Sequence, residues 1–182
     1  MKHTLAELAA GISAGIEIPA LLQKLVSFAL SRKDFFAGNF EPHINTVNVL
    51  RYWFGDNHDA MSQIVVFGCN GDGSLYALWL YGTQILEQAP VVFLGSEGTD
   101  NTVVASNITE FIQLLLLGID DLGFVISHPG WSTTISKRDT QVFSEWAEKE
   151  LGIIKPSDPE RLVRVAIETH ADFNAWLDCS RP

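Results

Sequence analysis

A glycine-rich segment between two apolar runs has the residue types and spacing that come closest to a recognised chemistry. The segment Gly68-Cys69-Asn70-Gly71-Asp72-Gly73-Ser74 has a GxxGxG spacing, which differs from the GxGxxG fingerprint of dinucleotide-binding folds. A phosphate-binding loop also needs a helix N-terminus or a lysine after it, whereas this segment leads into a second apolar run. The alternating carboxylates and closing glutamate of a calcium loop are missing as well. We therefore interpret the segment as a hairpin turn.

Residue spacing elsewhere in the sequence reveals no nucleophile, acid–base pair or metal-ligand cluster. The sequence contains no CxxC or HExxH motif, and its five histidines show no metal-ligand spacing. Cys69 has no basic residue near it in the sequence that would lower the pKa of its thiol. Gly95-Ser96-Glu97-Gly98 is one residue short of a GxSxG nucleophile elbow. We therefore expect no catalytic residue, no cofactor and no metal.

Acidic residues are concentrated in the middle of the chain. The net charge is −10, and residues 52–136 contain nine Asp or Glu and no Lys or Arg. Such a charge balance disfavours nucleic-acid binding, which needs a basic face. Two interpretations remain open, namely solubility through self-repulsion and an acidic face that attracts a basic protein partner. The candidate partner-binding residues are Asp72, Glu97 and Asp100, with Trp131 in a Pro-Gly loop as an exposed aromatic anchor.

The acidic candidates lie on turns between short apolar runs that are typical of β-strands. Ile64–Phe67 and Leu75–Tyr81 flank the glycine-rich turn and predict a β-hairpin. Val91–Leu94 and Thr102–Ala105 predict two further strands. Thr46–Phe54 is rich in β-branched and aromatic residues and predicts a strand before the hairpin.

Helical periodicity flanks these strands on both sides. The predicted helices run from Pro19 to Arg32-Lys33, from Asn107 to Gly118, from Thr140 to Leu151, and from a Ser157/Glu160 capping box to Leu177. Asn107 with Glu110 also has capping-box spacing. Strands in the middle and helices at the ends favour an α+β fold. We expect a central, mainly antiparallel sheet flanked by helices, with additional C-terminal helices.

Length and composition predict a single globular domain over residues 1–182, because 47% of the residues are hydrophobic and 19% are charged. Two cysteines, Cys69 and Cys179, are too few for a disulfide scaffold and fit a reducing cytoplasm. No apolar stretch reaches the roughly 20 residues of a transmembrane helix. Glu7 interrupts the apolar N-terminal segment, unlike the core of a signal peptide. We therefore expect a cytoplasmic protein that does not bind a membrane.

Three segments, in this order, carry a resemblance to a known family. Residues 67–78 (FGCNGDGSLYAL) join a Phe-Gly pair, a Gly/Asp turn and a Tyr-Ala-Leu run. Residues 89–94 (APVVFL) form a proline-led apolar run, and residues 104–112 (VASNITEFI) place small residues and a serine before Glu-Phe-Ile. Together they resemble the SUKH superfamily over about residues 64–117. The implied domain organisation is a SUKH-like core at about residues 18–117 with a helical C-terminal extension at about 118–182.

The resemblance implies a non-catalytic binding protein. The SUKH superfamily includes bacterial immunity proteins that neutralise toxins, often nucleases, and a fungal regulator of cell-wall glucan synthesis. It therefore implies a protein partner, most simply a basic toxin domain, and assigns no residue of this chain a role. Two alternatives remain open. One is an intracellular scaffold or regulator that binds an endogenous protein, and the other is an enzyme whose site combines His43, His58 or His128 with central carboxylates.

Overall fold

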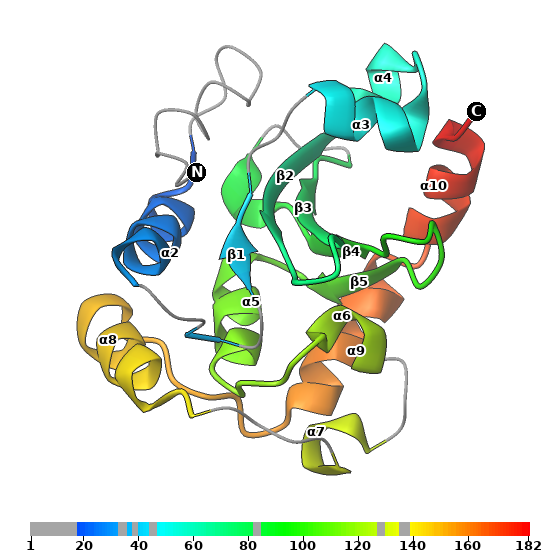
Figure 1. Cartoon of the computed structure of the whole chain (residues 1–182). Helices are drawn as coiled ribbons and strands as arrows, with labels where there is room; N and C mark the ends of the chain where they lie inside the picture. The colour runs from blue at the N-terminus through cyan, green and yellow to red at the C-terminus, as the bar shows by residue number, and fades with distance from the viewer. Residues whose placement is uncertain are drawn as a thin grey trace.

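A five-stranded antiparallel sheet forms the centre of the protein, with helices on both sides of it (Figure 1). The strands are joined in chain order, β1-β2-β3-β4-β5. This computed structural model confirms the α+β class and the mainly antiparallel sheet expected from the sequence. It describes residues 18–32, 36–37, 40–43, 47–81, 85–126, 130–134 and 139–182.

The register of the sheet brings several turns to one end of it. The strands are β1 (Glu41–Pro42), β2 (Ile64–Cys69), β3 (Leu75–Trp79), β4 (Val91–Leu94) and β5 (Thr102–Ala105). Leu75 at the start of β3 pairs with Cys69 at the end of β2 and with Leu94 at the end of β4. The β2–β3 turn and the β4–β5 loop therefore lie at the same end of the sheet. Glu41 of β1 also pairs with Cys69 and lies at this end.

Helices precede, interrupt and follow the strands. They are α2 (Ala20–Ser31), α3 (Val47–Phe54), α4 (His58–Met61), α5 (Ile108–Leu115), α6 (Leu122–Val125), α7 (Trp131–Thr134), α8 (Gln141–Leu151), α9 (Pro159–Thr169) and α10 (Phe173–Ser180), with a 3-10 turn, η1 (Leu86–Gln88). The predicted helices at α2, α5 and α8 are confirmed. Asn107 caps α5 by accepting a hydrogen bond from the Glu110 N–H at 3.0 Å. No helix in the described part of the chain is both long and apolar enough to span a bilayer.

Both faces of the sheet are buried, because alternate strand residues point to opposite sides and helices cover each side. The first face packs against α2, α5 and α8, and its strand residues are Val65, Phe67, Tyr76, Leu78, Val91 and Phe93 (the first core). The second face packs against α3, α4 and α10, and its strand residues are Ile64, Val66, Ala77, Trp79, Val92 and Leu94 (the second core). Helix α9 lies against β5 and adds Val163 to the first core and Ala166 to the second. Burial on both faces explains why β2, β3 and β4 are continuous apolar runs.

The strand predicted over Thr46–Phe54 is wrong, because residues 47–54 form α3; Thr46 lies outside the described residues. Trp53 and Phe54 lie three and four residues after Leu50, and all three are buried together in the second core. Tyr52, between them, is 75% exposed. Helical spacing of the buried side chains therefore outweighs a β-branched and aromatic composition, which indicates only that a segment suits a half-buried surface.

The single helix predicted over residues 157–177 is also wrong. A break at residues 170–172 divides it into α9 and α10. The N-terminal cap is Asp158, whose carboxylate accepts a hydrogen bond from a backbone N–H of the first turn at 2.9 Å, and not Ser157. Phe173, the first residue of α10, is buried in the second core. The C-terminal helices therefore complete the packing of the sheet.

Candidate functional site

The three acidic candidates gather at one end of the sheet. Asp72 lies in the β2–β3 turn, and Glu97 and Asp100 lie in the β4–β5 loop, all of them exposed. Glu41 of β1, also exposed, joins them. Four strand spacings separate β1 from β5, so the group spans about 19 Å across the sheet. We call these four carboxylates the acidic end.

Hydrogen bonds fix the β2–β3 turn against the β4–β5 loop. The Ser74 hydroxyl donates to Asp72 Oδ2 at 3.0 Å and accepts from the Ser96 N–H at 2.9 Å. The Ser74 N–H also donates to Asp72 Oδ1 at 2.8 Å. Ser74 is fully buried, whereas Asp72 is exposed and Ser96 is partly buried, so these bonds lie at the edge of the buried region. One serine thus links the two loops that carry the acidic residues.

The β4–β5 loop is held by its own side chains. Asn101 Oδ1 accepts from the Gly95 N–H at 3.1 Å, and its Nδ2 donates to the Gly98 carbonyl at 3.0 Å. The Thr99 hydroxyl donates to Asp100 Oδ2 at 2.9 Å. Asp100 itself has a φ of +58°, in the left-handed region that aspartate tolerates better than most residues. The loop therefore presents Glu97 and Asp100 from an ordered frame.

Carboxylates near this end of the sheet add to the effect of burial on two neighbouring pKa values. Burial, reinforced by the nearby carboxylates of Glu41 and Asp72, raises the pKa of the Cys69 thiol from 9.0 to about 11. Burial also raises the pKa of the Tyr76 phenol, with smaller increases from Asp121 and Asp72. The Cys69 thiol is therefore protonated at neutral pH and unsuited to nucleophilic attack. Within the described residues, no Lys or Arg lies at ion-pair distance from Asp72, Glu97 or Asp100.

Trp131 does not belong to this surface. It begins α7, is only 3% exposed and packs in the first core, so the expectation of an exposed aromatic anchor is wrong. The Ser132 hydroxyl next to it donates to Glu160 Oε1 of α9 at 2.9 Å, which ties α7 to α9. The Pro-Gly pair before Trp131 in the sequence was a poor basis for predicting an exposed side chain. Tertiary packing decides where a large aromatic side chain lies.

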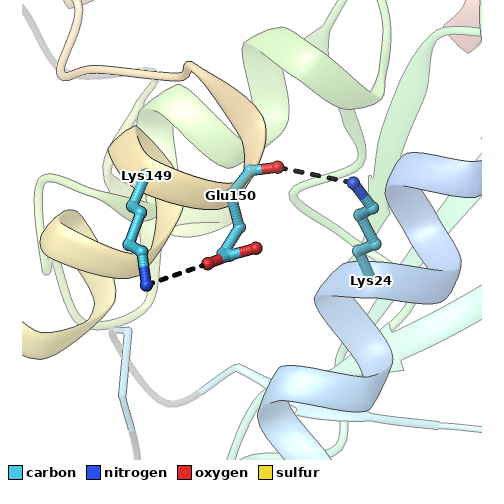
Figure 2. Close-up of polar contacts among 3 residues, drawn as sticks. All are labelled: Lys24, Lys149 and Glu150. Atoms are coloured by element: carbon cyan, nitrogen blue, oxygen red, sulfur yellow. Dashed lines mark hydrogen bonds and ion pairs between the residues drawn. The ribbon is translucent and has the colours of Figure 1, made fainter.

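A separate groove of about 690 Å³ lies between α2 and α8, and the sequence did not predict it. Phe28 and Trp146 stack within its lining, with ring centroids 4.3 Å apart. Lys24 Nζ donates to the Glu150 carbonyl at 3.4 Å, and the Glu150 carboxylate lies 3.4 Å from Lys149 Nζ (Figure 2). The Lys24 side chain thus joins α2 to the backbone of α8 beside the groove. Phe28 and Trp146 are half-buried.

Two of the three histidines considered for an assembled catalytic site, His43 and His58, lie within the described residues. His43 follows β1 and donates its backbone N–H to the Phe67 carbonyl at 3.1 Å. His58 is exposed at the start of α4, and His128 lies outside the described residues. In the described part of the chain, no three His, Cys, Asp or Glu side chains are grouped so that they could hold a metal ion.

Comparison of the chain with protein-family models, curated proteins and solved structures finds no match. The resemblance to the SUKH superfamily therefore rests on its three sequence segments and stays a prediction. In the structure these segments are consecutive, forming the β2–β3 hairpin, β4, and the junction of β5 with α5. The first two carry or adjoin the loops of the acidic end.

Proposed function

We propose that this chain is a non-catalytic protein-binding module that holds a basic protein at its acidic end. The observation that carries the proposal is the grouping of Asp72, Glu97 and Asp100, with no Lys or Arg of the described residues paired to them. A carboxylate that forms no ion pair within its own chain remains available to pair with a Lys or Arg of a partner protein. The described frame of hydrogen bonds also lowers the entropic cost of presenting these groups.

The partner class that suits this surface is a domain that itself binds phosphates. A nuclease needs a basic face for its substrate, and a set of carboxylates spread over about 19 Å can occupy such a face. We therefore propose that the chain acts as an immunity protein of the SUKH type, which neutralises a basic toxin domain. Its two cysteines, Cys69 and Cys179, are free, which supports action in the reducing cytoplasm.

The test combines partner capture with charge reversal. The tagged protein is used to capture partners from lysates of the cells that produce it and of competing strains, and the captured partner is then purified. Changing Asp72→Lys, Glu97→Lys and Asp100→Lys together should slow association at least about tenfold, because long-range attraction raises association rates by 10-fold or more. The loss should increase as the salt concentration is lowered and should vanish near roughly 1 M salt, where the Debye length is only about 3 Å.

A matched control carries the same charge change elsewhere. Glu148→Lys, Glu168→Lys and Asp178→Lys reverse three exposed carboxylates on α8, α9 and α10. This variant should keep most of the association rate. If both triple variants slowed association equally, this would falsify the local acidic site. The effect would then come from the net charge of the protein alone. Capture of an endogenous partner that binds equally well at high salt would favour the scaffold alternative.

A further inference from the structure

The amide side chain of Asn70, in the β2–β3 turn, is buried without a hydrogen bond. Asn70 is only 3% exposed, and neither its Nδ2 nor its Oδ1 has a partner. Native proteins almost always satisfy such groups, so an exception needs a physical account. Asn70 is also followed by glycine, and it is the only asparagine in the sequence that is.

Other asparagines of the described chain are held or differently placed. The side chains of Asn57, Asn101 and Asn107 each form hydrogen bonds with backbone groups. Asn48 and Asn174 are exposed and are followed by valine and alanine. Asn70 thus combines a free amide with a following residue that has no side chain.

The Gly71 N–H, next to that amide in the chain, takes no part in the backbone hydrogen bonds of the turn. Gly71 is exposed, and a Cβ added to it would meet nothing within 4 Å. The backbone hydrogen bonds of the turn run from Asn70 N–H to the Ser74 carbonyl and from Gly73 N–H to the Asn70 carbonyl, and none involves the Gly71 N–H. Neighbouring Asp72 also precedes a glycine, but both of its carboxylate oxygens are engaged by Ser74. Among the described residues, neither the Asn70 amide nor the Gly71 N–H, the two groups that would react, is therefore held by a hydrogen bond.

We propose that Asn70-Gly71 is a site of spontaneous deamidation. The Gly71 nitrogen, after losing its proton to hydroxide, attacks Asn70 Cγ and forms a C–N bond. The Cγ–Nδ2 bond breaks, and ammonia leaves with a proton from water. Water then opens the resulting five-membered succinimide at either carbonyl. The products are an aspartyl or an isoaspartyl residue at position 70, with no change in oxidation state.

The modification alters the acidic end directly. A neutral amide becomes a carboxylate two residues from Asp72, at a buried position where a charge is costly. The isoaspartyl product also adds a methylene group to the main chain between the two hydrogen bonds that close the turn. Deamidation therefore changes both the charge and the shape of the surface that carries Asp72, and the change is not reversed by the reaction itself.

The test uses the native full-length protein in warm, mildly alkaline buffer made with water enriched in heavy oxygen. Incubation continues until at least one asparagine has converted. Chymotrypsin is used for digestion, because the sequence has no Lys or Arg between Arg51 and Lys137. We expect the Asn70 peptide to convert first, to gain the mass of heavy-oxygen hydroxyl in place of amide, and to contain isoaspartate. Conversion of Asn48 or Asn174 while Asn70 remains intact overturns the proposal.

Gly71→Ala supplies the matched variant. Because Gly71 has open space around it and no positive φ, the alanine should leave the turn folded. Its methyl group hinders the attack of the nitrogen, so conversion at Asn70 should become as slow as at the other asparagines. Conversion at an unchanged rate, or without isoaspartate, excludes the succinimide route. Isomerisation of Asp72 does not replace an amide by a hydroxyl group. The peptide mass therefore distinguishes it from deamidation of Asn70.

Discussion

Ser74 is the residue on which the geometry of the acidic end depends. Its hydroxyl satisfies the Ser96 N–H and reaches Asp72, although the side chain is fully buried. Ser74→Ala should lower the free energy of unfolding by about 1–3 kcal/mol, because it leaves the partly buried Ser96 N–H without its partner and removes a hydrogen bond to Asp72. Urea denaturation of the variant and the parent protein measures this difference.

Thr99→Ala is the control for that measurement. The Thr99 hydroxyl also binds a carboxylate, Asp100, but it is exposed, so water replaces the lost hydrogen bond. We expect a change within about 0.5 kcal/mol, as for most surface substitutions. Similar losses in the two variants would show that the Ser74 bonds do not link the loops.

At the residue scale, the sequence predicted the exposure of the acidic candidates but not their full surroundings. Asp72, Glu97 and Asp100 follow apolar strands in turn-forming segments, which is a local signal. Glu41 was missed because it lies before residues 52–136, the segment without Lys or Arg. Only the pairing of β1 with β2 at Cys69 brings it to the same end of the sheet. Trp131 was misplaced for the same reason, since its burial depends on packing with segments distant in the sequence.

At the scale of elements, the period of buried residues was more reliable than composition. β2, β3, β4 and β5 were predicted because turn residues delimit short apolar runs. α3 was missed, because its β-branched and aromatic residues resemble a strand, while Leu50, Trp53 and Phe54 follow a helical period. The break between α9 and α10 carries no proline or glycine at residues 170–172, so it had no local signal.

The packing of α10 on the second face gives an element-scale prediction. Phe173 is 1% exposed and contacts the Trp79 ring, with centroids 5.1 Å apart. Phe173→Ala should lower the free energy of unfolding by about 3–5 kcal/mol, as for other buried aromatic truncations. Chemical denaturation gives the value. Ile167→Ala, at a position that is 38% exposed, should cost much less. A loss below about 1 kcal/mol at Phe173 would mean that α10 is not part of the core.

For the whole molecule, the two cores determine which part of the chain can fold alone. The resemblance suggested a core at about residues 18–117, but Ala166, Phe173 and Leu177 lie in the second core. A fragment of residues 18–117 should therefore lack a cooperative unfolding transition and should bind a hydrophobic dye that the full chain does not bind. Circular dichroism during urea titration tests this. A sigmoidal transition resembling that of the full chain would show that the C-terminal helices are dispensable.

Because the second core includes residues of α10, it can be completed only after α10 has been synthesised on the ribosome. Ala105 ends β5 and Phe173 begins α10, and translation at 5–20 residues per second needs roughly 3–14 s to cover that distance. Until α10 has been made, Phe173 cannot cover Trp79, and we expect this part of the second face to be open to solvent, where exposed apolar surface promotes aggregation. We therefore expect slower synthesis between β5 and α10 to lower the yield of folded protein in cells.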